Sequence, residues 1–197
     1  DSRSFGFVPM TSVLGRVVYS LRSAGEHGHV ANAPSSAAGD AAVAEARRFG
    51  AVLASHDDTT AGQVATSARH GATFAEFPTT VEAAQECRAR GIYVMMGAPN
   101  LIRGGSHSGN VAAKDLAQMD LLDILSSDYV PSALLSAALM LGDQWGDLPR
   151  GVATVTSAPA KATGLVDRGQ LALGLRADVI RVARLAQAAA VRGVWVG

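Results

Sequence analysis

The segment from residue 97 to residue 110 carries the densest group of anion-binding residue types in the chain. It reads Gly-Ala-Pro-Asn-Leu-Ile-Arg-Gly-Gly-Ser-His-Ser-Gly-Asn and follows an apolar run at residues 92–96. Glycine lets a backbone approach a ligand closely and turn its N–H groups toward it. An arginine guanidinium matches the geometry of phosphate oxygens. The composition alone is equally typical of a surface loop, but its position after a strand favours a site for a polyphosphate or another anion.

Three further residues with acid–base or metal-binding side chains each stand just after an apolar run. His56 precedes two carboxylates, and a neutral imidazole beside an orienting aspartate suits a divalent metal. Asp128 follows two serines and either binds a metal, accepts a proton from water, or caps the helix that Pro131 begins. Glu76 lies next to phenylalanine, where it either binds a metal or anchors a loop. Singly, such residues are typical of structural positions, but their shared place after strands favours a common site.

The elements that must position these residues alternate regularly from residue 40 onward. The pattern predicts helices over residues 40–50, 59–71, 79–91, 112–118, 130–141 and 149–156, and strands over residues 51–54, 73–77, 92–96 and 121–125. We expect Asp58 or Thr59 to cap the second helix, and Thr79 with Glu82 to form a capping box for the third. Short apolar strands separated by helices predict βα units on a parallel sheet.

The polar residues that follow the strands fit the carboxyl end of such a sheet, where a (β/α)8 barrel builds its active site. A doubly wound sheet places ligands at the same end. We see four βα units, whereas a full barrel needs ~250 residues. We therefore predict an α/β fold that is the C-terminal half of a TIM barrel, at residues 37–156. A small C-terminal β segment follows at residues 157–197, and residues 1–36 stay unassigned.

The first 36 residues show no pattern that we can assign to a helix or strand. Residues 27–29 read His-Gly-His, which resembles the metal-binding pair of many barrel hydrolases. Because Ser-Ala-Gly-Glu precedes it instead of an apolar strand, we interpret it as a solvated loop. The chain starts with Asp1 and lacks a signal-peptide pattern, so we expect it to begin within a longer gene product.

The composition excludes several classes of protein. The chain has 197 residues, 48% of them hydrophobic and 17% charged, which is typical of one globular core. A net charge of zero and 5% aromatic residues argue against binding of nucleic acid or a membrane surface. No apolar run reaches the ~20 residues of a membrane helix. The lone cysteine, Cys87, cannot form an internal disulfide, and we expect an inert buried thiol in a reducing cytoplasm.

Five motifs in a fixed order resemble one enzyme family. They are ASHDD at residues 54–58, AEFPTT at 75–80, MGAPN at 96–100, RGGSHSGN at 103–110 and LDILSSDY at 122–129. In this order they resemble the α-D-ribose 1-methylphosphonate 5-triphosphate diphosphatases of the carbon–phosphorus lyase pathway. That family belongs to the metal-dependent amidohydrolase superfamily, and the resemblance runs from about residue 40 to the C-terminus. The segment 167–178 is similar to the closing β segment of the superfamily.

The resemblance implies a hydrolase that acts on a phosphoric anhydride in bacterial phosphonate catabolism. It implies release of pyrophosphate from a phosphorylated ribose phosphonate, leaving a 5-phosphate. His56 and Asp128 would bind a divalent metal, for which we expect zinc, with Glu76 as a further ligand. Asp128 would also take the proton of the attacking water. The substrate-binding residues would be Asn100, Arg103, Gly104, Gly105, Ser106, His107, Ser108 and Asn110.

The resemblance also sets the expected partners and the rival functions. It implies the substrate as partner, with no nucleic acid and no membrane, and leaves homo-oligomer formation open. The family's first-strand metal motif should precede residue 1, so we expect an incomplete metal site and an open barrel edge in this chain alone. The first alternative is another amidohydrolase, a deaminase or an aminoacylase. The second is a non-catalytic half barrel that needs an N-terminal partner.

Overall fold

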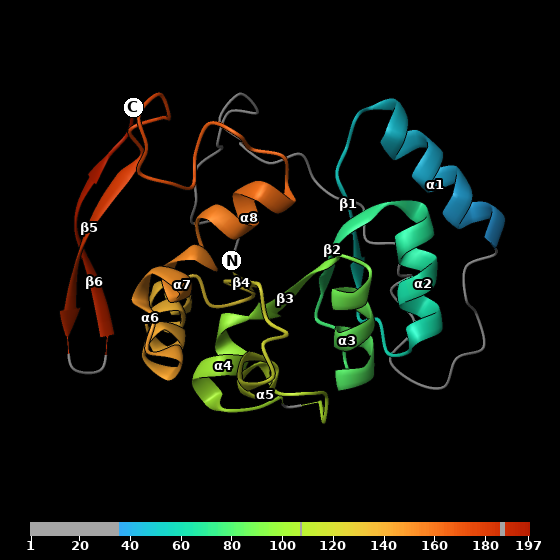
Figure 1. Cartoon of the computed structure of the whole chain (residues 1–197), viewed down its shortest axis with the longest axis horizontal. Coiled ribbons are helices and arrows are strands. Elements are labelled where there is room, and N and C mark those ends of the chain that lie inside the picture. The colour runs from blue at the N-terminus through green and yellow to red at the C-terminus, as the bar shows by residue number, and fades with distance from the viewer. Residues whose placement is uncertain (1–35, 107, 186–187) are drawn as a thin grey trace, which may run out of the picture.

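A computed structural model describes residues 36–106, 108–185 and 188–197 of the chain (Figure 1). The histidines predicted to lie in a loop at residues 27–29, and His107 of the glycine-rich segment, fall outside the described residues. The elements, in chain order, are α1 (Ser36–Arg48), β1 (Leu53–His56), α2 (Ala61–His70), β2 (Ala72–Glu76), α3 (Val81–Ala89), β3 (Tyr93–Gly97), α4 (Ala98–Arg103), α5 (Ala113–Gln118), β4 (Ile124–Ser126), α6 (Ala133–Trp145), α7 (Leu148–Ala153), α8 (Ser157–Ala162), β5 (Val179–Leu185) and β6 (Ala188–Trp195).

The first four strands form one parallel sheet in the order β1-β2-β3-β4. The predicted α/β fold with a parallel sheet is therefore confirmed. The register places His56 opposite Glu76 and Gly97 opposite Ser126, so the last residues of neighbouring strands lie side by side. Because all four strands run the same way, the segments that follow them meet at one edge of the sheet.

The two faces of the sheet pack against different helices, because side chains alternate along each strand. Ala75, Val94 and Leu125 belong to the larger buried cluster, to which α2, α3, α4, α5 and α6 contribute. Phe74 and Ile124, on the opposite face, pack with residues of α8. Figure 1 shows α8 on one side of the sheet and α4 with α5 on the other. The strands therefore form the middle layer of three.

Side-chain caps fix the helices that follow β1 and β2, although not through the residues that the sequence predicts. Thr60 caps α2 and forms a reciprocal capping box with Gln63, so neither Asp58 nor Thr59 is the cap. Gly71 ends the helix in a left-handed conformation with φ of 87°.

The predicted capping box of Thr79 with Glu82 is also wrong. Thr80 caps α3 by accepting a hydrogen bond from the backbone N–H of Ala83. The Glu82 carboxylate accepts a hydrogen bond from the N–H of Ala61 in the first turn of α2. A tertiary contact between the two helix starts therefore takes the carboxylate that the local pattern assigned to a cap.

The glycine-rich segment begins as a helix and not as a loop. Pro99 lies in the first turn of α4, where its missing N–H leaves no helical bond unmade. Gly104 ends the helix with φ of 78°, and its N–H donates to the carbonyl of Leu101. Arg103 is therefore the last residue of a short helix that begins directly after β3.

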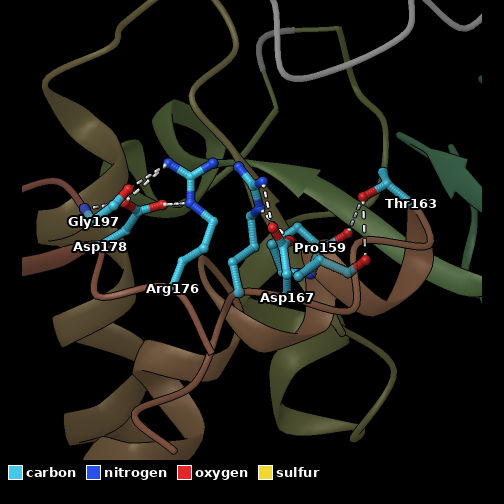
Figure 2. A network of polar contacts seen from close by, with 8 residues as sticks. Pro159, Thr163, Asp167, Arg176, Asp178 and Gly197 are labelled. Atoms are coloured by element: carbon cyan, nitrogen blue, oxygen red, sulfur yellow. Dashed lines mark hydrogen bonds and ion pairs between the residues drawn. The ribbon is translucent and has the colours of Figure 1, made fainter. Parts of the chain in front are cut away.

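The C-terminal part combines an unexpected helix with the expected β segment. The sequence did not predict α8, whereas β5 and β6 pair antiparallel as a hairpin beside α6. Figure 2 shows how the segment before β5 is tied to the C-terminus: the Arg176 guanidinium pairs with the Asp178 carboxylate at 3.1 Å and donates to the Gly197 carbonyl at 3.3 Å. Asp178 in turn accepts the N–H of Gly197 at 3.2 Å.

The boundaries at residues 36 and 156, which the sequence analysis places between the N-terminal segment, the half barrel and the C-terminal β segment, stay predictions.

The core confirms the predicted state of the cysteine. Cys87 is buried in the larger cluster, and burial, with the charges of Asp58 and Glu86 as smaller causes, raises the pKa of its thiol to about 12. A neutral buried thiol is chemically inert at physiological pH. Among the described residues, no helix combines the length and the apolar character needed to cross a membrane.

Candidate functional site

A cavity of about 490 Å³ lies at the carboxyl ends of the four parallel strands. Every strand contributes a residue from the segment that follows it: Asp57 after β1, Thr79 after β2, Arg103 after β3 and Asp128 after β4. This is the edge of the sheet where parallel α/β folds place ligands. The cavity therefore joins residues that are up to 72 positions apart in the sequence.

Three residues directly after the strands have a left-handed backbone. Asp57, Phe77 and Asp128 have φ values of 57°, 57° and 49°. Aspartate tolerates this region, but a bulky phenylalanine there is a genuine outlier. Such backbone costs about 1–3 kcal/mol per residue and gathers at functional sites. The turn of the chain at each strand end directs these side chains toward the cavity rather than along the sheet.

Gly97 provides the space that Asp128 occupies. A Cβ atom at Gly97 would lie 3.0 Å from Oδ2 of Asp128 and 3.5 Å from Cε1 of Phe77. The backbone of Gly97 is extended, with φ of −73°, which any residue can adopt. Glycine is required here because the Asp128 side chain lies too close for a Cβ atom. The Asp128 carboxylate consequently lies against the end of β3 and lines the cavity.

His56, Glu76 and Asp128, predicted to share a site, lie close enough to influence one another. The imidazole Nδ1 of His56 lies 3.1 Å from Oδ2 of Asp57, as expected for an adjacent orienting carboxylate. Its ring meets the ring of Phe77 edge to face, with 5.3 Å between centroids. Burial raises the pKa of the Glu76 carboxyl; the His56 charge lowers it, and the charges of Asp128 and Asp57 raise it further.

The types of these donors suit a metal ion, whereas their placement does not. Imidazole nitrogen and carboxylate oxygen are ligands that zinc and similar divalent ions accept. Within residues 36–106, 108–185 and 188–197, however, no group of three or more His, Cys, Asp or Glu side chains lies close enough together to hold an ion. The described residues therefore do not form a metal site by themselves.

The donor side of the cavity comes from the segment after β3. Arg103, Gly105, Ser106, Ser108 and Asn110 all line it, whereas Gly104 does not. The turn is held by its own bonds: the N–H of Gly105 donates to the Asn100 carbonyl, and the N–H of Ser108 donates to the Ser106 hydroxyl. Guanidinium and hydroxyl groups thus face a volume that carboxylates border on the other side.

Asn100 has a defined structural task besides lining the cavity. Its Oδ1 accepts the N–H of Ala113 at 2.9 Å, the first residue of α5. The residue before that helix, Ala112, offers no side-chain cap. Asn100 therefore connects the end of α4 to the start of α5. This contact holds the two ends of the turn that carries Gly105 and Ser106.

Sequence reasoning missed three polar residues of the cavity: Thr59, Thr79 and Tyr129. The Thr79 hydroxyl donates to that of Thr59 at 2.8 Å, and the Thr59 hydroxyl donates to the carbonyl of Asp57 at 3.3 Å. Tyr129 accepts a hydrogen bond from Arg103. Their common signal is position: each lies within three residues after the end of its strand.

Comparison with known proteins agrees with this architecture, although no protein-family model matches the chain. The chain is 51% identical over 158 residues to the alpha-D-ribose 1-methylphosphonate 5-triphosphate diphosphatase of Escherichia coli (strain K12). That alignment covers 79% of this chain and 41% of the relative, so the chain spans about two fifths of its curated relative's length.

Solved structures share the fold at low sequence identity. An amidohydrolase matches with a TM-score of 0.53 and 21% identity, over 75% of this chain and 41% of that chain. A prolidase complexed with N-methylphosphonate-L-proline matches with a TM-score of 0.53 and 19% identity, over 71% of this chain and 40% of that chain. The resemblance to the diphosphatase family is thus confirmed, and the fold is that of part of an amidohydrolase barrel.

Proposed function

We propose that this chain forms part of the active site of a diphosphatase that acts on α-D-ribose 1-methylphosphonate 5-triphosphate. The observation that carries the proposal is the cavity at the carboxyl ends of β1–β4, which has Arg103 and hydroxyl donors on one side and Asp128 on the other. The identity to the E. coli enzyme named for this reaction supports the substrate. A hydrolase of phosphonate catabolism, as the sequence predicts, is part of the same proposal.

The triphosphate would lie against the segment after β3. Arg103 supplies a forked pair of N–H donors for phosphate oxygens, and Ser106, Ser108 and Asn110 supply neutral donors around it. Gly105 borders open space, since a Cβ there would meet no described atom within 4 Å, and its backbone is therefore accessible to a phosphate oxygen. We keep Asn100, Gly104 and His107 in the proposed substrate-binding set. Preorganised donors of this kind stabilise the charge that develops on phosphoryl oxygens.

The acidic side of the cavity would handle the attacking water. We assign Asp128 the role of general base, because its carboxylate lines the cavity and occupies the space that the missing Cβ of Gly97 leaves. Water adds to the phosphorus of the α-phosphate, the anhydride bond to the β-phosphate breaks, and pyrophosphate leaves. The water's proton passes to the Asp128 carboxylate, and the 5-phosphate stays on the ribose.

His56, Glu76 and Asp128 remain our proposed ligands for a divalent ion, with zinc expected. The described residues, however, do not bring three such side chains close enough together to hold an ion. We therefore derive no step of the reaction through a metal. The part of this chain in the reaction is to hold the triphosphate and to accept the proton.

Pyrophosphate release from α-D-ribose 1-methylphosphonate 5-triphosphate tests the proposal. The chain would be assayed by itself and fused to the part of the E. coli relative that it does not cover, with zinc supplied. We expect turnover in the fused form and loss of turnover in Arg103→Ala. Arg69→Ala is the matched control, because Arg69 lies on α2 and bonds to Thr66. Turnover that releases ammonia from an amine substrate, without pyrophosphate, would replace this function with that of a deaminase.

A further inference from the structure

Arg103 and Tyr129 meet in the wall of the cavity. The Nη1 of Arg103 donates a hydrogen bond to the phenol oxygen of Tyr129 at 3.2 Å, and both side chains line the cavity. They come from different segments, since Arg103 ends α4 after β3 and Tyr129 follows β4. This hydrogen bond therefore connects two neighbouring βα units directly above their strands.

The backbone on each side of the contact is held firmly. Gly104 stops α4 immediately after Arg103 with left-handed φ of 78°. Asp128 has left-handed φ of 49° just before Tyr129, and the N–H of Val130 closes the turn onto the carbonyl of Ser127 at 3.0 Å. The two side chains consequently start from fixed positions and not from mobile loop tips.

The electrostatics leave the guanidinium available to a ligand. Within the described part of the chain, Arg103 makes the bond to Tyr129 and no ion pair. Other arginines of the described chain, such as Arg88 and Arg150, pair with aspartates. A guanidinium has five N–H donors in a planar fork, so one bond to a phenol leaves donors for a phosphate.

We infer that Tyr129 is a positioning residue for anion binding: its hydroxyl holds the Arg103 guanidinium over the cavity. An exposed arginine loses much side-chain freedom when it binds a ligand, and a partner that holds it beforehand reduces that loss. Tyr129 is 59% exposed, so its hydroxyl and not its packing is what the site uses. The inference rests on the proposed function, because it deepens the binding of phosphate by Arg103.

Calorimetric titration of the full chain with inorganic tripolyphosphate tests the inference through a double-mutant cycle. The variants are Tyr129→Phe, Arg103→Ala and the combination of both. Loss of the hydrogen bond that holds the Arg103 guanidinium predicts that Tyr129→Phe raises Kd about threefold to tenfold. Arg103→Ala should raise it further, and Tyr129→Phe should then add nothing. Tyr93→Phe is the matched control, since Tyr93 lies at the start of β3 and lines a separate cavity beside α8.

Each outcome decides between defined alternatives. An equal effect of Tyr129→Phe with and without Arg103 would mean that the hydroxyl touches phosphate itself, and this overturns the positioning role. An unchanged Kd in Tyr129→Phe, or an equal increase in Tyr93→Phe, overturns it as well. If the unmodified chain does not bind tripolyphosphate, the proposed function and the inference both fail. If that chain binds and only the Tyr129 result is negative, the proposed function stands.

Discussion

The two ends of the four parallel strands differ in the pairing of their charged residues and in the strain of their backbone. At the carboxyl ends, Asp57, Phe77 and Asp128 have left-handed backbone, and Asp128 and Arg103 border an open cavity. At the amino ends, the charged residues are joined to partners. Of the non-glycine residues described with positive φ, only Asp120 lies at the amino side, in the turn before β4.

The amino side is built as a connected network. Asp123, just before β4, accepts the N–H of Val94 at 2.9 Å and pairs with Arg88 of α3 at 3.2 Å. Arg150 of α7 pairs with Asp120 and lies over the ring of Trp145, 3.9 Å from its centroid. These contacts join α3, β3, β4 and α7, so they hold the layers together. The ion pairs at the amino side stabilise the fold. The charged groups of Arg103 and Asp128 at the carboxyl side can therefore serve a ligand instead.

The largest expected effect in this comparison is on activity, without a matching effect on stability. Asp128→Asn removes the proposed base and should lower pyrophosphate release about 10²–10⁴-fold. The unfolding free energy should stay the same or rise slightly, because the Asp128 charge raises the pKa of Glu76 and so opposes its ionisation. Turnover and urea unfolding, both measured on the fused form, give the two quantities. A drop of more than about 1 kcal/mol in unfolding free energy would place Asp128 among the stabilising residues and break the comparison.

The opposite result is expected at the amino side. Arg88→Ala leaves half-buried Asp123 without its cationic partner and should cost about 1–2 kcal/mol of unfolding free energy, with turnover unchanged. Burial already raises the pKa of Asp123, whereas the N–H of Val94 and the charge of Arg88 lower it. Without Arg88 the folded-state pKa of Asp123 should rise further.

The sign of the pH dependence follows from that shift. A carboxyl whose folded-state pKa lies above its unfolded value favours folding when protonated, and this contribution disappears as pH rises through the folded-state pKa. The cost of Arg88→Ala should therefore be larger at pH 7 than at pH 3.5. Arg90→Ala is the control, since Arg90 pairs with Glu86 one turn away on the protein surface. Equal costs at both pH values would show that Asp123 does not depend on Arg88.

The regular part of the fold was predictable because short-range signals determine it. The βα alternation located four strands within three residues of their observed starts, and Gly71 and Gly91 mark helix ends as expected. Parallel strands bring whatever follows them to one edge, which is why the sequence predicts a common site for His56, Glu76 and Asp128. Asp128 lines the cavity, whereas His56 and Glu76 are not among its lining residues, so their shared role stays a prediction. The resemblance to one family supplied the chemistry, and the cavity supports it.

Contacts between distant segments were not predictable. Glu82 has the spacing of a capping-box residue, but it bonds to Ala61 twenty-one residues away. Phenylalanine gives no signal for a left-handed backbone, so Phe77 could not be recognised as a turn residue. Tyr129 follows the predicted Asp128 directly, but its relevance depends on the position of Arg103 twenty-six residues earlier.

The smallest effect separates a glycine of the site from a glycine of the scaffold. Gly97→Ala introduces a Cβ 3.0 Å from Oδ2 of Asp128, and this carboxylate must move by a few tenths of an ångström. The unfolding free energy should change by less than about 1 kcal/mol, because a side-chain end can yield and alanine restricts the unfolded chain. Turnover should nevertheless fall about tenfold, since displacement of a catalytic group by 1 Å costs on the order of 10²-fold. Gly62→Ala is the control: its Cβ would meet nothing closer than 3.8 Å, and alanine within α2 should raise the unfolding free energy by about 0.5–1 kcal/mol with turnover unchanged. If both variants keep full turnover, the reaction does not depend on the position of Asp128 beside Gly97. Asp128 would then no longer support a functional difference between the two ends of the sheet.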